Sequence, residues 1–361
     1  MFIKSLKLKN YRNYDSLNLT FDEKTNILYG NNAQGKTNIL EALYLCGTTK
    51  SHRSAKDQDL INFNSDDAHI EVVFDKAEIE YKIDFHLKKF AAKGIAINKV
   101  PIKRASDLFG HIHFVFFSPE DLTIIKDGPS ARRKFIDFEL SQLDKIYLND
   151  LSKYDKIVKQ RNSLLKDIGY QNNQQEMLDI WDEKLIEYGN KIISSRHDFI
   201  SKINRIVSEI HRKITNGIEE LEIIYEKSNG DNSLEEEIKK NRNKDLRLKT
   251  TTVGPHRDDI IIKANNIDLR KYGSQGQQRT AALSLKLSEI DLVQKQIDDT
   301  PILLLDDVLS ELDKNRQHFL LESIRHIQTL ITCTGLDEFV NHRFSINKLF
   351  YVENGTVITE N

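Results

Sequence analysis

Cysteine is scarce in this chain of 361 residues, and neither sign of charge is in clear excess. The two cysteines, Cys46 and Cys333, lack the spacing of a metal site and cannot form a disulfide framework, so both are expected to be reduced thiols. Lys and Arg number 53 against 55 Asp and Glu, a formal net charge of −2. Any nucleic-acid partner would therefore have to meet a local basic surface.

Long apolar runs are absent as well. No stretch approaches the roughly 20 apolar residues that a membrane-spanning helix needs. The start, MFIKSLKLKNYRNY, carries a charge every few residues instead of the apolar core of a signal peptide. With 39% hydrophobic residues, the chain can still bury a sizeable core in two or three lobes. We expect a cytoplasmic protein without a membrane partner.

The spacing of apolar residues changes twice along the chain. Alternation typical of strands dominates the first 120 residues, apart from a helix-like segment near 36–46. Spacings of three and four then predict helices over about 130–215, interrupted by the polar sequence GYQNNQQ. This interruption indicates an antiparallel helical hairpin with short arms. Strand signals return afterwards, in LEIIYEK, DDIIIKANNIDLR, PILLLDD and TLITCTG.

A phosphate-binding loop is the strongest motif. The sequence YGNNAQGKT matches G-x-x-x-x-G-K-[ST], in which glycines let backbone N–H groups face phosphate oxygens at the start of a helix. Lys36 would reach the β- and γ-phosphates of ATP, and the Thr37 hydroxyl would bind Mg²⁺. An incidental glycine turn is the alternative, but an apolar run precedes the loop and a helical stripe follows it. The predicted ATP-binding residues here are Gly30, Asn31, Asn32, Ala33, Gln34, Gly35, Lys36 and Thr37.

Two carboxylates end the apolar run ILLLDD, which is typical of a strand buried on both faces of a parallel sheet. Asp306 at the strand end suits a second Mg²⁺ anchor, and Asp307 could orient or deprotonate the attacking water. We therefore predict Asp307, Asp306 and Lys36 as catalytic residues, with Thr37 and Asp306 as metal ligands. Helix capping is the alternative role for the aspartates. For Ser310 and Asp313, capping and function both remain open.

The stretch YGSQGQQRTAA contains no obvious nucleophile, metal ligand or titrating base. It precedes a helix and lies upstream of the acidic strand. That strand follows the phosphate loop at an unusually large separation along the sequence. This arrangement resembles the ATP-binding-cassette heads of the SMC and Rad50 class. The resemblance implies that Ser274, Gly276 and Gln277 contact the γ-phosphate of ATP held by a second protomer, in an ATP-dependent homodimer. A glutamine-rich helix cap is the alternative.

The resemblance narrows to the RecF family of bacterial recombination mediators. It is carried by segments in the family's order that span nearly the whole chain: LKLKNYRNYDSLNLTF, YGNNAQGKTNILEALY, FSPEDL, GPSARRKFID, YDKIVKQRNSLLK, TTVGPHRDD, SQGQQRT and LLLDDVLSELD. It implies an ATP-dependent dimer that binds DNA at gaps or duplex–single-strand junctions. Such a dimer would work with RecR, and by extension RecO, to help load RecA. Slow ATP hydrolysis would act as a timer for release.

The fold implied is an α/β P-loop NTPase of the ABC-type ATPase head class, with an inserted β-rich subdomain and a helical arm lobe. We expect one half of the head in 1–120, the arm lobe in 121–245 and the other half of the head in 246–361. Arg12 matches an arginine that contacts nucleotide in Rad50-like heads. No switch histidine follows TLITCTG, and Thr332 or Thr334 could substitute for it. The roles of His256 and Arg257 in GPHRDD stay open.

Binding of duplex DNA without sequence preference relies on Lys and Arg against phosphates. No aromatic-rich basic groove is evident, which favours a duplex or junction over a dedicated single-strand binder. A solvated charged helix face is the alternative for every candidate. The candidates are Lys126, Arg132, Arg133, Lys134, Lys153, Lys156, Lys159, Arg161, Lys191, Arg196 and Arg205.

Two other protein classes remain open from the sequence. A transporter-type ATPase subunit would have a shorter insert and would dock on a membrane partner. A small-molecule P-loop kinase would need an acceptor pocket with its own base, and none is recognisable. The helical hairpin and the GPHRDD segment count against the transporter subunit.

Overall fold

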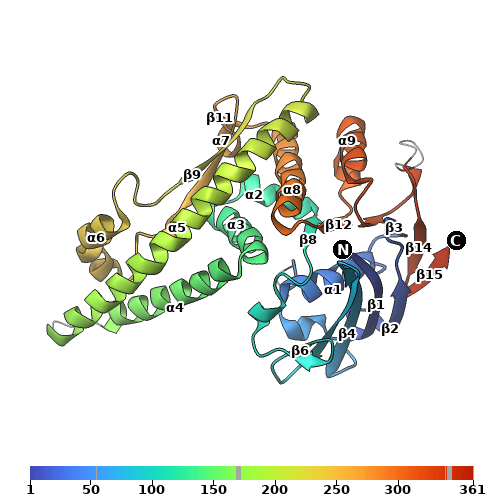
Figure 1. The fold of residues 1–361 in the computed structure, drawn as a ribbon, viewed down its shortest axis with the longest axis horizontal. Helices are drawn as coiled ribbons and strands as arrows, with labels where there is room; N and C mark the ends of the chain where they lie inside the picture. The colour runs from blue at the N-terminus through green and yellow to red at the C-terminus, as the bar shows by residue number, and fades with distance from the viewer. Residues whose placement is uncertain (54, 168–171, 338, 340–343, 361) are drawn as a thin grey trace. The chain divides into compact units, whose positions relative to one another are not determined.

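The computed structural model describes residues 1–53, 55–167, 172–337, 339 and 344–360 (Figure 1). The chain forms two compact units, one of Met1–Asp121 with Lys286–Asn361 and the other of Leu122–Leu285. The second unit thus continues to Leu285, whereas the sequence suggested a boundary at 245. The physical reason is that the strands at 221–226 and 259–264 pack on helices of the same unit.

One sheet of the first unit is antiparallel, with strand order β2-β1-β4-β5-β6-β7. Alternating residues of its longer strands are buried, as the period of two in the sequence predicts. The strands are β1 (Phe2–Tyr11), β2 (Tyr14–Thr20), β4 (Asp67–Lys76), β5 (Ile79–Lys88), β6 (Gly94–Ile97) and β7 (Val100–Pro101). This sheet is the expected β-rich subdomain.

The other sheet of the first unit has the order β15-β14-β3-β13-β12-β8, and all its pairings except β14 with β15 are parallel. Helix α1 (Lys36–Thr48) contacts strands of both sheets, so its stripe of Ile39, Leu40 and Leu43 is completely buried. The strands are β3 (Thr25–Tyr29), β8 (Phe114–Phe117), β12 (Ile302–Asp306), β13 (Thr329–Cys333), β14 (Lys348–Glu353) and β15 (Thr356–Glu360). Helix α9 (Lys314–Ile324) follows β12.

The second unit is mainly helical. Its helices α4 (Lys145–Asp167) and α5 (Asn172–Ile214) pack against each other, which fits the expected hairpin. Part of the GYQNNQQ break, residues 168–171, lies outside the described residues, and Asn172 is already helical. The remaining elements are α2 (Leu122–Lys126), α3 (Pro129–Leu143), β9 (Leu221–Glu226), α6 (Leu234–Leu248), β10 (Asp259–Ala264), β11 (Ile267–Asp268) and α7 (Leu269–Tyr272). Helix α8 (Gln275–Ile297) begins here and continues into the first unit.

Three of the basic residues expected to contact DNA are buried instead. Arg132, Arg161 and Arg196 are between 0% and 2% exposed. Arg132 binds both oxygens of Asp259, at 2.7 and 3.0 Å, and Arg196 binds Asp137 at 2.7 Å. The prediction of DNA contact was wrong for these three. A helical charge pattern does not distinguish a buried arginine with a carboxylate partner from an exposed one.

The histidine of the GPHRDD segment, His256, has a structural role. His256 lies between the Tyr154 hydroxyl, 2.7 Å from Nδ1, and the Thr251 carbonyl oxygen, 3.1 Å from Nε2. Nε2 must carry the hydrogen to bind a carbonyl, so Nδ1 accepts from Tyr154. Burial lowers the pKa of His256 to about 4. Arg257 binds the same Thr251 carbonyl, so it holds the segment together internally, and His256 fastens the segment to Tyr154 of α4.

We expect the stability of the protein to decline as the pH falls from about 6.5 to about 4. In this window the unfolded chain protonates His256 and the folded chain does not, so acid favours unfolding. Burial gives His52 the same direction of shift. Urea unfolding of the wild type and of His256→Gln, at pH 7 and pH 5, checks the contribution of His256. The variant should lose less stability on acidification, and an equal loss would contradict the assignment.

Among the described residues, no helix has both the length and the apolar character required to cross a membrane.

Candidate nucleotide site

The phosphate loop joins β3 to α1 at the carboxyl ends of the parallel strands, where open α/β sheets bind ligands. Its backbone is left-handed at three positions, with φ of 141° at Gly30, 63° at Ala33 and 118° at Gly35. In the part of the chain that the structure describes, the N–H groups of residues 32–35 donate no hydrogen bond to the protein. These donors, at the start of α1, fit an anionic ligand such as a triphosphate.

Lys36 lies over this loop. Its ammonium donates to the carbonyl oxygens of Gly30, at 2.6 Å, and Asn31, at 2.7 Å. Burial lowers the pKa of Lys36, while the charges of Asp307 and Asp306 oppose that shift. Among the described residues, the ammonium is thus held by two backbone oxygens of the loop, which a phosphate can replace.

Gln34 is fixed by two hairpin turns. Asn13, in the turn between β1 and β2, donates from its side-chain amide to the Gln34 carbonyl at 2.9 Å. The backbone N–H of Asn354, in the turn between β14 and β15, donates to Gln34 Oε1 at 2.6 Å. A Cβ at Gly35 would lie 2.6 Å from both the Asn13 amide nitrogen and the Tyr14 hydroxyl. The two turns thus fix the loop, and the side chains of Asn13 and Tyr14 together with the φ of 118° favour a glycine at 35.

The Thr37 hydroxyl donates to Asp306 Oδ1 at 2.7 Å, and their role as metal ligands remains a prediction. Strand β13 lies between β3 and β12, and from it Thr332 donates a second hydrogen bond of 2.7 Å to the same oxygen, Asp306 Oδ1. Burial raises the pKa of Asp306, and the two hydroxyl donors oppose the rise. Among the described residues, no group of three or more His, Cys, Asp and Glu could hold a metal. Thr37 and Asp306 suit Mg²⁺, which takes few protein ligands when phosphates supply the others.

Asp307 follows in a left-handed conformation, with φ of 52°. Its N–H donates to the Thr332 hydroxyl at 3.0 Å. The Thr332 hydroxyl therefore binds both aspartates. It contacts the side chain of Asp306 and the backbone N–H of Asp307. The hydroxyl of Thr332 is used for these contacts, whereas Thr334 is exposed. The sequence suggested Thr332 only as a partner of the γ-phosphate, because the strand order that places it between β3 and β12 is not visible in the sequence.

Thr332→Val should reduce ATP hydrolysis by about 10- to 100-fold with little change in ATP affinity, because small displacements of catalytic groups have effects of this size. Valine has the shape of threonine but cannot donate to Asp306 or accept from Asp307. Single-turnover hydrolysis and nucleotide titration measure the two quantities. Thr329→Val, which is buried on the same strand, is the matched control. Equal rates in both variants would contradict the role of Thr332.

Arg12 is turned toward the protein. Its Nε and Nη2 donate to the two oxygens of Glu41, at 2.8 and 2.7 Å, and its Nη1 donates to the Asp59 carbonyl at 2.8 Å. Glu41 is completely buried and also accepts from Ser51 at 2.5 Å. In this arrangement Arg12 braces α1 and has its donors directed at the protein. Contact between Arg12 and nucleotide remains a prediction.

Ser274 and Gln277 belong to the second unit. They form a reciprocal cap of α8, in which the Ser274 N–H donates to Gln277 Oε1 at 2.9 Å and the Gln277 N–H donates to Ser274 Oγ at 3.2 Å. The side-chain amide of Gln277 also donates to Glu219 at 2.9 Å. Gln277 is therefore committed to internal contacts, whereas Ser274 is exposed. The sequence did not indicate Glu219.

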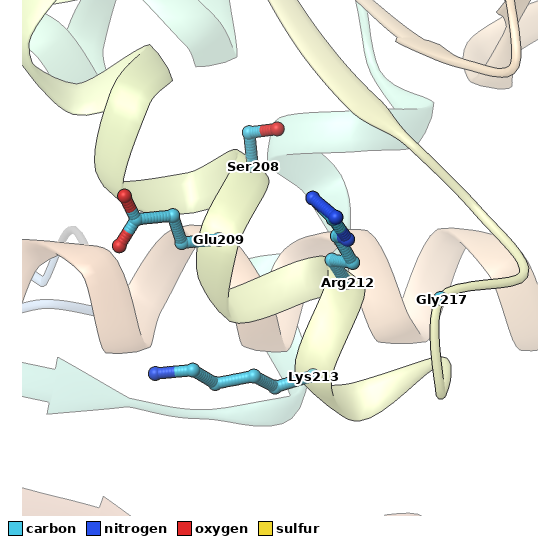
Figure 2. A pocket seen from close by; sticks show the side chains of 5 residues that line it. All are labelled: Ser208, Glu209, Arg212, Lys213 and Gly217. Carbon is cyan, nitrogen blue, oxygen red and sulfur yellow. The ribbon is translucent and has the colours of Figure 1, made fainter.

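A pocket of about 420 Å³ lies at the end of α5 in the same unit, lined by Ser208, Glu209, Arg212, Lys213 and Gly217 (Figure 2). Arg212 and Lys213 are exposed, and Glu209 offsets part of their charge. The pocket lacks the phosphate-loop donors, which are in the first unit.

Comparisons with known proteins point to one family over nearly the whole chain. The family model described as "RecF/RecN/SMC N terminal domain" matches residues 2–357. A relative from Agathobacter rectalis, named DNA replication and repair protein RecF, is 58% identical over 357 residues, which is 99% of each chain. One of the same name from Lachnospira eligens is 57% identical over all of both chains.

Solved structures are similar too. Two are described as the recombination mediator protein RecF in the RecFOR pathway, one with ATP and one with "ATPrS". Each has a TM-score of 0.93 and 38% identity and covers 100% of this chain and 98% of its own. An SMC head bound to the C-winged helix domain of ScpA, with a TM-score of 0.59 and 17% identity, shares the fold alone.

Proposed function

This chain belongs to the RecF family of the RecF/RecN/SMC class, and from that premise we propose that it is an ATP-dependent DNA-binding protein of recombinational repair and replication restart. The observation that carries the proposal is the group formed by Thr37, Asp306 and Thr332 beside a phosphate loop with open backbone donors. RecF relatives named as DNA replication and repair proteins support the pathway. A transporter-type subunit and a small-molecule kinase lose their support because the family is RecF.

The residues of the loop bind the triphosphate of ATP through their N–H groups and Lys36. Thr37 and Asp306 hold Mg²⁺, which neutralises charge on the phosphate oxygens. Asp307 orients the attacking water and takes its proton, with its backbone fixed by Thr332. The proposed activity is slow ATP hydrolysis that ends the DNA-bound state.

A second copy of the chain completes the site. Ser274 at the start of α8 presents a hydroxyl and a helix N-terminus, both suited to a γ-phosphate. Two identical composite sites then form about a two-fold axis, and ATP closes the dimer. The dimer binds DNA at gaps or duplex–single-strand junctions and works with RecR, together with RecO and RecA in the same pathway.

The remaining candidates for DNA contact are the basic side chains that are not buried. Phosphate contacts of exposed lysines predict weaker binding at higher salt. Arg133 is half-buried and donates to the Asp258 carbonyl, so it is the weakest of them. The exposed candidates are Lys126, Lys134, Lys153, Lys156, Lys159, Lys191 and Arg205.

The test is fluorescence anisotropy of a labelled duplex with a single-strand gap, at fixed salt, with and without ATP and Mg²⁺. We expect tight binding by the wild type only with ATP. Lys36→Ala is the control, because it removes the contact with the β- and γ-phosphates and should give the same weak binding under both conditions. Equal binding by the wild type with and without ATP would refute an ATP-dependent clamp.

A further inference from the structure

The turn that follows α5 is built around Thr215. Its hydroxyl donates to the His211 carbonyl at 2.8 Å and accepts from the Glu219 N–H at 3.3 Å. The N–H of Gly217, which is in the left-handed region with φ of 78°, donates to the Arg212 carbonyl at 2.7 Å. Figure 2 shows Gly217 in this turn, after Arg212 and Lys213 at the end of the helix. These contacts fix the backbone that leads into Glu219.

Glu219 bridges α5 and α8 with its two oxygens. Its Oε1 accepts from the Gln277 side-chain amide at 2.9 Å, and its Oε2 lies 3.2 Å from His211 Nε2. His211 is completely buried, and its other ring nitrogen lies 2.9 Å from the Ser284 hydroxyl, two turns further along α8. The side chain of Glu219 is only 17% exposed. The carboxylate therefore has a defined position between two helices.

The contact with Glu219 decides which way the Gln277 amide points. A carboxylate accepts only, so it selects the orientation with the NH₂ toward Glu219 and the oxygen toward the Ser274 N–H. The opposite orientation would place two oxygens together and leave the Ser274 N–H facing an NH₂ group. The backbone N–H of Gln277 donates to Ser274 Oγ, so this oxygen acts as an acceptor. The exposed Ser274 then has its hydroxyl hydrogen directed to an outside acceptor.

We infer that Glu219, held by His211, is a positioning residue for the loop that reaches the second protomer's nucleotide. Glu219 does not touch ATP. It fixes Gln277 so that Ser274 presents its hydroxyl to a phosphate without rearrangement. This inference rests on the proposed ATP-dependent dimer. It assigns Gln277, the second glutamine of SQGQ, to the support of Ser274 instead of to nucleotide contact.

Two substitutions at the same position test the inference on the full-length chain. Glu219→Leu removes the acceptor, whereas Glu219→Gln keeps an oxygen that can accept from the Gln277 amide. A hydrogen bond to a charged group is stronger than one between neutral groups, so we expect Glu219→Leu to weaken ATP-dependent dimerisation at least about tenfold. Glu219→Gln should restore much of it. Glu220→Leu, an exposed neighbour, is the matched control and should dimerise like the wild type.

Sedimentation velocity with ATP and Mg²⁺ gives the dimer affinity, and nucleotide titration at low protein concentration gives the affinity of the single protomer for ATP. The protomer's ATP affinity should match that of the control, because the phosphate loop is in the first unit and Glu219 is in the second. A general loss of structure would weaken ATP binding by the protomer as well and would not be rescued by glutamine. If Glu219→Leu dimerises as Glu220→Leu does, the inference is wrong.

Amide exchange in the nucleotide-free chain keeps this test separate from the proposed function. The peptide containing residues 274–278 should exchange faster in Glu219→Leu than in Glu220→Leu, whether or not the wild type dimerises. A wild type that fails to dimerise with ATP would refute the proposed dimer alone. Unchanged exchange in that peptide would overturn the positioning role by itself.

Discussion

Asp307→Asn should lower the rate of ATP hydrolysis by about 10²–10⁴-fold, the range in which positioned general bases act, and should trap the ATP-bound dimer. Asparagine keeps a side-chain oxygen that can orient water but cannot accept its proton. The substitution also keeps the backbone, because asparagine tolerates the left-handed conformation of Asp307, with φ of 52°. The contact from the Asp307 N–H to Thr332 is a backbone contact and should remain.

The matched control is Asp298→Asn. Asp298 has the same φ of 52° and is exposed in the connection before β12. Single-turnover hydrolysis and sedimentation with ATP measure the rate and the lifetime of the dimer. We expect Asp307→Asn to form a long-lived dimer and Asp298→Asn to behave as the wild type. Hydrolysis by Asp307→Asn at the wild-type rate would contradict its assignment as the base.

The phosphate loop and the acidic strand could be predicted because their chemistry is local in sequence. One loop of consecutive residues carries the open backbone N–H groups of residues 32–35, and Asp306 ends a strand whose apolar run marks it as buried. Their meeting, at 2.7 Å between Thr37 and Asp306, required only that both strands belong to one parallel sheet. The arm lobe was predictable for a similar reason, because helical periodicity is a property of neighbouring residues.

Contacts between distant residues could not be predicted in this way. Thr332 lies beside Asp306 because β13 is between β3 and β12, and strand order is not a local property. Glu219 meets Gln277 through a turn that follows a helix of 43 residues. The arginines of the arm lobe show the same limit. Arg161 is buried and Lys159 is exposed, although they are two positions apart in one charged helix.

Arg161→Met should destabilise the second unit by about 3–5 kcal/mol, which is the usual cost of removing one member of a buried ion pair. Arg161 is completely buried on α4. It binds Asp182 on α5 at 2.6 Å and Asp245 on α6 at 2.7 Å. Its Nη1 also donates to Thr251 at 2.9 Å. Methionine fills much of the same space, so the expected loss comes mainly from two carboxylates that lose their partner.

Acidification distinguishes this cause from a loss of packing. Burial already raises the pKa of Asp182 with Arg161 beside it, and without the arginine that pKa should rise further. A carboxyl whose pKa is higher in the folded chain takes up a proton on folding, so acid favours the folded state of the variant. The loss of unfolding free energy in Arg161→Met, relative to the wild type, should therefore be smaller at pH 5 than at pH 7.

The chain's single tryptophan, Trp181, is the neighbour of Asp182 in α5, so its fluorescence reports urea unfolding of this unit. Lys159→Met is the matched control, because the same side chain then replaces an exposed cation on the same helix. We expect the control to change stability by less than about 0.5 kcal/mol. A deficit of Arg161→Met that stays constant with pH would mean that packing of the side chain, and not its charge, holds the three helices together.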